Sequence, residues 1–189
     1  MIAFIFRLFD ALKGPALLQL LWHLLTRVSR LTEHEFQVVS SVLAPTSIRF
    51  SSVRIAEGRI LRIIFRFNKS RAFTLFHTLN LPDTGHHSRE NIGLLVHELI
   101  HTLQFETVGS IYIRQALRAQ KTDGYQYGGW GQLVDDWAEG KHFRDYNREQ
   151  QGQIAQDYYN DVVAKALSST DPIFMAYEPF IDELRARDI

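Results

Sequence analysis

The segment IGLLVHELIHTLQF, residues 92–105, contains the pattern HExxH within an almost continuous apolar run. Residues four apart lie on the same side of a helix, so the imidazoles of His97 and His101 can reach one metal ion. Glu98 then lies beside that ion, where a general base is needed. The segment therefore predicts a buried, zinc-binding helix around which the rest of the fold is built.

The ends of this helix are predicted by its neighbours. Ser88 is a suitable N-cap and Gly109 is typical of the position after a helix, so we expect a helix over about residues 89–108. Apolar residues surround it so widely that its His and Glu side chains should be buried, where they need partners. A metal would satisfy them. The alternative is a pair of hydrogen-bonded core histidines that bind nothing. Gly93 should let a neighbouring backbone come close.

A catalytic zinc ion needs a third protein ligand, with one position left open. The metzincin extension HExxHxxGxxH is excluded, because the chain has Gln104 and Thr107 where that motif requires Gly and His. Glu106 should rotate away from the metal-binding side of the helix and be solvated or paired. The acidic residues that follow the motif are Glu106, Asp123, Asp135, Asp136, Glu139 and Glu149.

Among these acids, Glu149 is the preferred ligand, while Asp123 and Glu139 remain alternatives. Asn147 reads as an N-cap with Gln at position 150, close to a capping box, and predicts a second helix that runs to about residue 168. Glu149 lies in its first turn, from which a carboxylate can face the first helix. Gly152, one turn later, should allow the two helices to approach closely. Asp157 is a candidate hydrogen-bond acceptor for a ligand imidazole.

The sequence before the motif predicts a small sheet. A short helix is expected over residues 36–43, and residues 47–55 alternate as a strand does. Residues 60–67 are compatible with a strand or a helix, whereas residues 72–81 read as the last strand before the metal-binding helix. We expect an α+β fold in which an edge strand beside that helix holds an extended peptide.

Residues 1–31 are strongly apolar but are not expected to span a membrane. Charged residues and Gly14-Pro15 interrupt the run, which leaves about a dozen uncharged residues where a bilayer requires roughly 20. Helical spacing predicts one or two amphipathic helices, with Pro15 near the start of the second. They should pack on the core or a sister subunit, or bind a partner protein or a membrane surface with help from Arg27 and Arg30. Without a standard signal peptide, a cytoplasmic location is favoured over ordinary secretion, and export by a specialised system stays open.

Composition limits the possible functions. The chain has 189 residues, is 46% apolar and carries 21 basic and 21 acidic residues, so no nucleic-acid partner is expected. It has no cysteine, which excludes disulfides, thiolate zinc sites and a cysteine nucleophile. We expect one globular domain over residues 45–189, preceded by an amphipathic helical segment over residues 1–44.

Several segments together resemble the compact HExxHxxQ metallopeptidase-like domains of the gluzincin type, found in bacteria near Rhs, Vgr and contractile-injection proteins. The resemblance covers about residues 45–165 and is carried by residues 95–104, 125–127, 143 and 147–152. It implies a minimal zincin-like domain whose third ligand is Glu149. Gln153 departs from the family, which has an acid at that position. A rival resemblance is to the aspzincins, whose aspartate motif is echoed around Asp123.

The resemblance implies zinc-dependent hydrolysis of peptide bonds, with Zn²⁺ as cofactor, Glu98 as general base and a peptide or protein as substrate. The alternative is a catalytically inactive interaction module on a zincin scaffold, associated with a bacterial secretion or injection system. Residues 125–131 should form an ordered or movable loop near the cleft. Candidate oxyanion donors are Tyr125, Tyr127, His142, Tyr158 and Tyr159.

Overall fold

The computed structural model describes residues 2–189 and has an α+β fold with a four-stranded mixed sheet of order β1-β2-β4-β3. The helices are α1 (Ile2–Ala11), α2 (Gly14–Leu25), α3 (Glu33–Val39), α4 (Ile60–Phe67), α5 (Ile92–Val108), α6 (Ile111–Ala119), α7 (Gly129–Ala138), α8 (Arg148–Tyr158) and α9 (Pro172–Arg185). The strands are β1 (Arg27–Ser29), β2 (Arg54–Glu57), β3 (Phe73–Leu75) and β4 (Thr78–Asn80).

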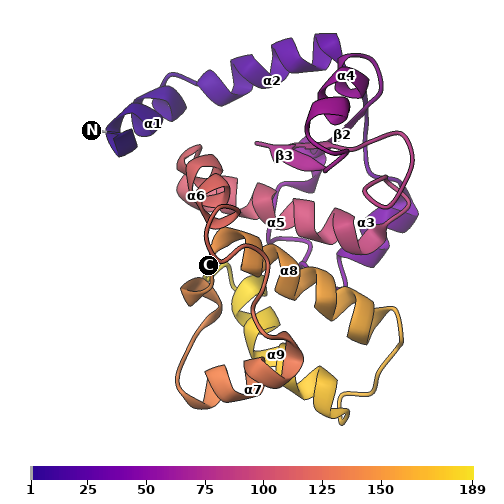
Figure 1. Cartoon of the computed structure of the whole chain (residues 1–189), viewed down its shortest axis with the longest axis vertical. Coiled ribbons are helices and arrows are strands. Elements are labelled where there is room, and N and C mark those ends of the chain that lie inside the picture. The colour runs from indigo at the N-terminus through magenta and orange to yellow at the C-terminus, as the bar shows by residue number, and fades with distance from the viewer. Residues whose placement is uncertain (1) are drawn as a thin grey trace.

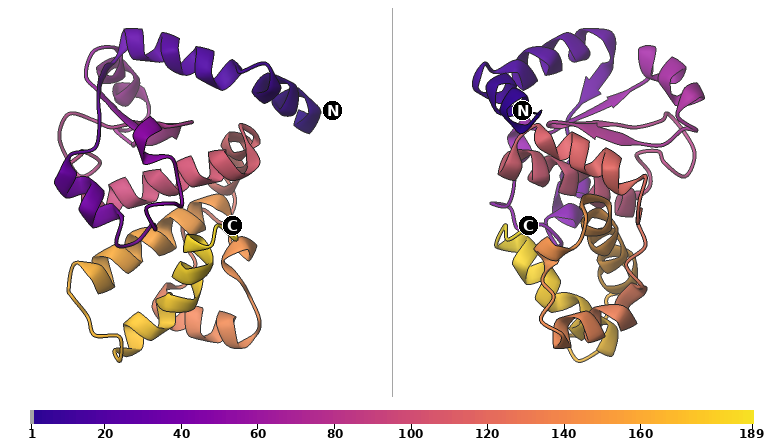
Figure 2. Two further views of the ribbon diagram at one scale, coloured as in Figure 1. Left: turned by 180° about the vertical axis from the view of Figure 1, so that it is seen from behind. Right: turned by 60° about the vertical axis from the view of Figure 1, so that its left-hand side comes forward.

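The elements are stacked in layers. Helices α2 and α4 lie at one end of the molecule, the small sheet follows, and α5 packs on the other side of the sheet (Figure 1). Helix α8 runs beside α5, and α7 and α9 form the opposite end, as the two further views confirm (Figure 2). The predicted metal-binding helix is therefore the central layer, in contact with both the sheet and the second predicted ligand helix.

The sheet differs from the sequence prediction in two places. Residues 72–81 form a hairpin of β3 and β4 rather than one strand, because the chain reverses at Phe76, whose φ is 59°. Tyr112 holds this turn: its hydroxyl donates to the Thr74 carbonyl and accepts from the Phe76 amide. In the stretch 47–55 only the last residues form a strand, since a 3-10 turn (Phe50–Ser52) precedes β2. Residues 60–67, whose sequence is compatible with a strand or a helix, form α4.

Helix α5 starts later than predicted. Its N-cap is Asn91, whose side chain accepts from the Leu94 amide at 3.0 Å, and not Ser88. It ends at Val108 as expected, and Gly109 follows with a φ of 76°. Twelve consecutive residues from 93 to 104 are buried, because the sheet, α3 and α8 cover the helix on several sides. The prediction that this helix is mostly buried is confirmed.

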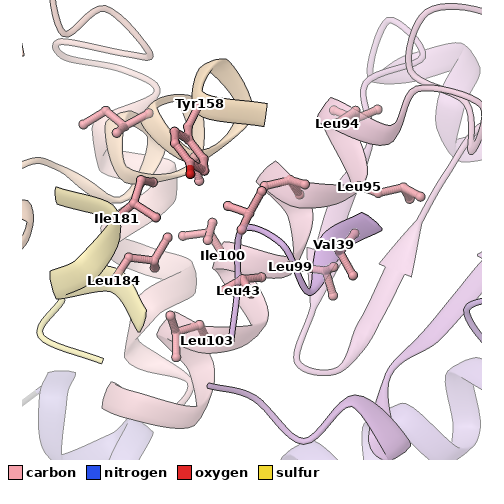
Figure 3. Close-up of a cluster of buried hydrophobic side chains, with 14 of the residues drawn as sticks. Val39, Leu43, Leu94, Leu95, Leu99, Ile100, Leu103, Tyr158, Ile181 and Leu184 are labelled. Atoms are coloured by element: carbon pink, nitrogen blue, oxygen red, sulfur yellow. The ribbon is translucent and has the colours of Figure 1, made fainter. Parts of the chain in front are cut away.

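The main core joins α3, α5, α8 and α9. Figure 3 shows apolar side chains of α5 between those of the α3 region and those of α9, with Tyr158 of α8 beside them. Helix α3 begins at Glu33 and ends at Val39, so the helix predicted for residues 36–43 lies further along the chain than observed. Beyond it, Val42 and Leu43 are fully buried in this core. The predicted division at residue 44 stays a prediction.

Leu43→Ala should lower the free energy of unfolding by about 3 kcal/mol, because a fully buried leucine is replaced and a cavity remains. Leu18→Ala on α2 is the matched control: its side chain is 45% exposed, so the change should stay within about 0.5 kcal/mol. Urea unfolding followed by circular dichroism measures both. Equal effects would mean that residues 40–43 do not support the core in solution.

Helix α8 is capped as predicted: Asn147 accepts from the amides of residues 149 and 150, and Gln150 completes the capping box. It does not continue regularly to residue 168, because a π-helical turn (Tyr159–Val163) follows. This turn brings Asn160 against Gly93, so Gly93 makes room for a side chain rather than for a backbone. Both N-terminal helices are confirmed, with Pro15 in the first turn of α2. Within residues 2–189 no helix combines the length and apolar character needed to cross a bilayer.

Candidate metal centre

Two helices bring three ligand side chains together. His97 and His101 lie one turn apart on α5, and Glu149 lies in the first turn of α8. The Nε2 atom of His97 is 3.4 Å from Oε2 of Glu149, and Nε2 of His101 is 3.7 Å from Oε1. All three residues are buried, and their ligand atoms lie within 4.8 Å of one another. This triad can hold a metal ion.

The spacing suits a tetrahedral site. Zinc binds imidazole nitrogen and carboxylate oxygen at about 2.0 to 2.1 Å, so neighbouring ligands of a regular tetrahedron are roughly 3.3 Å apart. The two imidazole–carboxylate distances of 3.4 and 3.7 Å are close to that value. Two nitrogens and one oxygen leave a fourth position for water or substrate.

The surroundings of the triad also fit a metal. Glu149 Oε2 is buried and has no hydrogen-bond partner among the described residues, which is costly unless something positive binds it. Gly152 faces His97 so closely that a Cβ atom there would lie 2.7 Å from Cε1 and 2.8 Å from Nε2 of the ring. The sequence prediction that Gly152 permits close approach of the helices is confirmed, and the space it leaves is filled by a ligand imidazole.

The charges of the triad are strongly coupled. Burial lowers the pKa of His101, but hydrogen bonding and the negative charge of Glu149 outweigh it and raise the pKa to about 9. Burial raises the pKa of Glu149, yet the two imidazoles outweigh it and hold that pKa far below its usual value. Glu149 is therefore an ionised carboxylate at neutral pH, as a metal ligand must be, whereas a metal has to displace the proton that this carboxylate holds on His101.

Hydrogen bonds orient the ligands. Nδ1 of His101 lies 2.8 Å from Oε1 of Gln104, so the ring can donate there and present Nε2 to the metal. Gln104 is fixed in turn by donating to the Arg148 carbonyl and to Gln151. Nδ1 of His97 has no partner among the described residues. Asp157, which the sequence suggested for this role, instead accepts from Tyr127 and Gln153.

Glu98 is held beside the triad by the sheet. Thr74, on β3, donates to Oε2 of Glu98 at 2.7 Å and lies 3.0 Å from its backbone carbonyl. Glu98 is buried at 4% exposure, but it lines two adjoining clefts of about 360 and 240 Å³. Ala72, His97 and Tyr125 line both of these clefts as well. The carboxylate is thus fixed in position and still faces space in which a substrate can lie.

The alternative acids lie elsewhere. Asp123 and Glu139 are exposed and belong to no ligand cluster among residues 2–189. Glu106 is paired, as the sequence suggested: its Oε1 is 2.8 Å from Nε2 of His77 and 3.1 Å from Nε of Arg49. Of the acids considered as third ligand, only Glu149 joins both histidines in a described cluster.

The proposed oxyanion donors are distributed unevenly. Tyr125 packs against the His97 ring, with centroids 5.6 Å apart, and lines both clefts. Tyr127 is buried and hydrogen-bonded to Asp157 and Tyr177, so it has a packing role. His142 pairs with Glu183 of α9. Within the described chain Tyr125 is the candidate with direct access to the triad.

Gly152→Ala should lower zinc affinity about 10- to 100-fold, because the added Cβ must displace the His97 ring from its position. Alanine is otherwise the better helix former, so the substitution isolates the steric effect. Gly131→Ala in α7 is the matched control, since nothing lies within 4 Å of its Cβ position. Competition titration against a zinc indicator measures both variants. Wild-type affinity in Gly152→Ala would place the bound metal away from His97.

In comparisons of the chain with known proteins, no family model, no curated protein and no solved structure matches it. The resemblance to gluzincins therefore stays a prediction based on motifs. The structure itself shows the buried triad, the adjoining glutamate and the clefts beside them.

Proposed function

We propose that the chain is a zinc-dependent peptidase of the gluzincin type, with Glu98 as general base. One observation carries this function: the ligand atoms of His97, His101 and Glu149 converge within 4.8 Å of one another, directly beside a glutamate that faces two clefts. A structural zinc site needs neither an adjoining base nor adjoining space. Hydrolysis needs both.

The roles of the residues follow from their positions. Zinc held by the triad would lower the pKa of a water molecule and polarise the scissile carbonyl. Glu98 takes the proton from the attacking water and passes it to the leaving amine. Thr74 keeps the Glu98 carboxylate pointing into the cleft, and its hydrogen bond to Oε2 leaves Oε1 for the proton.

Tyr125 is our candidate for stabilising the oxyanion. Burial, followed by the negative charge of Glu149, raises the pKa of Tyr125 above its usual value, so the phenol stays protonated and can donate a hydrogen bond. It comes from the segment between α6 and α7, next to Gly124, whose φ is 61°. The Gly124 amide donates to the Ala119 carbonyl and the Gly124 carbonyl accepts from Asn147, so Tyr125 follows a point that is fixed to α6 and to the N-cap of α8.

An extended peptide is the substrate class we favour. Strand β3 is an edge strand that pairs only with β4 in the described sheet, and residues 72–75 line the smaller cleft together with Glu98. An edge strand offers its free amides and carbonyls to a peptide backbone, although the Thr74 carbonyl of β3 already accepts from Tyr112. A peptide added there would pass the Thr74–Glu98 pair, where the scissile bond has to lie.

Thr74→Val should reduce kcat by about tenfold, because Glu98 loses the hydroxyl that orients it while shape and volume are nearly kept. Thr74→Ser retains the hydroxyl and should recover most of the rate. Zinc content, measured by mass spectrometry, should be the same in both variants. A serine variant as slow as the valine variant would assign Thr74 a packing role instead.

A second function is favoured by one contact. Gln120, the C-cap of α6, donates to Oε1 of Glu149 at 2.9 Å and so competes with a metal for that oxygen. In an interaction module on the same scaffold, this contact would replace the metal. Zinc analysis combined with a peptide-library cleavage assay separates the two functions. Stoichiometric zinc with cleavage supports the peptidase, whereas a chain that takes up no added zinc supports the module.

A further inference from the structure

The apolar sides of α1 and α2 face solvent. Leu12 is 73% exposed, and Phe4 and Leu24 are each 68% exposed. Soluble monomers rarely leave so many large apolar side chains of neighbouring helices uncovered. We call this set of side chains the N-terminal apolar face, and it consists of Phe4, Ile5, Leu8, Leu12, Leu17, Leu18, Leu21, Leu24 and Leu25.

This orientation is fixed by polar contacts on the inner side of the two helices. Trp22 donates from Nε1 to Asn80 at 2.6 Å, and His23 lies 2.9 Å from the Thr78 hydroxyl, so the polar side of α2 is attached to β4. Asp10, at the end of α1, accepts from the amide and hydroxyl of Ser110. Leu17, Leu21 and Leu24 therefore point away from the sheet, because hydrogen-bonding side chains occupy the side that faces it.

Helix α4 extends the same end of the molecule. It lies with α2 on the side of the sheet opposite to α5 (Figures 1 and 2), and Arg59 at its start donates to the Leu24 carbonyl at 3.3 Å. Ile63 is 58% exposed and Phe67 is 85% exposed. The helix also carries Arg66, directly before Phe67, and Arg62, which pairs with Asp83.

The charge of the chain is divided unevenly. Residues 1–71 contain eleven basic and four acidic side chains, whereas residues 72–189 contain ten basic and seventeen acidic ones. The overall balance hides this asymmetry. The apolar face thus belongs to the basic part of the chain, with Arg7, Lys13, Arg27 and Arg30 on or next to the two helices.

We propose that the N-terminal apolar face binds the surface of an anionic phospholipid bilayer. The helices would lie in the interface with their leucines in the acyl region and the flanking arginines at the headgroups. Neither helix is long enough to cross the bilayer, so the association is peripheral. A second copy is a poorer occupant, because pairing two such faces would bring two basic surfaces together.

Co-sedimentation of the full chain with vesicles tests this. Vesicles of phosphatidylcholine with phosphatidylglycerol should bind the protein, pure phosphatidylcholine vesicles should bind it far less, and salt should weaken binding. The triple variant Leu17→Gln, Leu21→Gln, Leu24→Gln should bind about 30-fold less tightly. Met175→Gln on α9 is the control, with a side chain that is 58% exposed at the opposite end, and should bind as wild type does.

A charge variant separates headgroup attraction from apolar burial. Arg27→Gln with Arg30→Gln should weaken binding about 25-fold on anionic vesicles only. Arg144→Gln with Lys165→Gln removes the same charge from exposed positions elsewhere and should have little effect. Equal binding to both vesicle types, no binding, or full binding by the leucine variant would overturn the membrane assignment. So would a dimer that the leucine substitutions dissociate.

Discussion

Glu98→Gln is expected to reduce peptide hydrolysis by about 1,000-fold or more while leaving the zinc content unchanged. Glutamine has nearly the same shape and can still accept the hydrogen bond from Thr74, so the fold and the cleft are kept. It cannot take a proton from the attacking water. The measurement is kcat/KM on a peptide identified from a cleavage library, with metal analysis of the same preparation.

Glu139→Gln is the matched control for this experiment. Residue 139 is exposed and lies in no described ligand cluster, so the same chemical change there should leave both activity and zinc unaffected. It also tests Glu139 as an alternative third ligand. Cleavage that persists in Glu98→Gln would exclude Glu98 as the base. A contaminating peptidase or another acid would then account for the activity.

The candidate triad could be predicted from sequence because its determinants are local. The four-residue spacing of His97 and His101 is a helical repeat, and the capping pattern around Asn147 sets the start of the helix that carries Glu149. Gly152 was expected where two helices approach, and the structure fills that space with the His97 ring. Such features depend on neighbours along the chain.

Contacts between residues far apart in the sequence could not be predicted from it. The Thr74–Glu98 hydrogen bond joins residues 24 apart and depends on where the β3–β4 turn falls. The sequence signal for that turn was weak, because Phe76 is a non-glycine residue with positive φ and looks like a strand residue. Asp157 was misassigned because its partner, Tyr127, lies 30 residues away.

Alternation of polar and apolar residues predicts a strand wrongly where the apolar residues are buried from an irregular segment. Residues 47–55 alternate between polar and apolar residues, but Ile48 and Val53 are buried in the core from an irregular segment with a 3-10 turn. In the N-terminal segment the spacing of apolar residues correctly predicts helices, but it does not predict which side of each helix faces the protein. Polar groups on β4 decide that.

Glu149→Ala should lower zinc affinity by at least about 100-fold, because two imidazoles alone hold the metal in the variant. It should also destabilise the metal-free chain by about 3 kcal/mol, since the carboxylate is 1% exposed and pairs with His101, whose pKa it raises to about 9. Zinc titration and urea unfolding measure the two effects. Asp157→Asn is the control on the same helix and should keep its zinc, because Asp157 contacts Tyr127 and Gln153 instead.

The two effects of Glu149→Ala separate a metal ligand from a structural acid. If Glu149 is a metal ligand, the variant is less stable in two respects: its metal-free chain is weakened, and added zinc no longer stabilises it. Zinc stabilises the wild type by mass action, because it binds only the folded state. A structural acid would give the first loss but leave the stabilisation by zinc intact. If zinc still raises the unfolding midpoint of Glu149→Ala as much as that of the wild type, the third ligand is another residue, and the tetrahedral site proposed here is wrong.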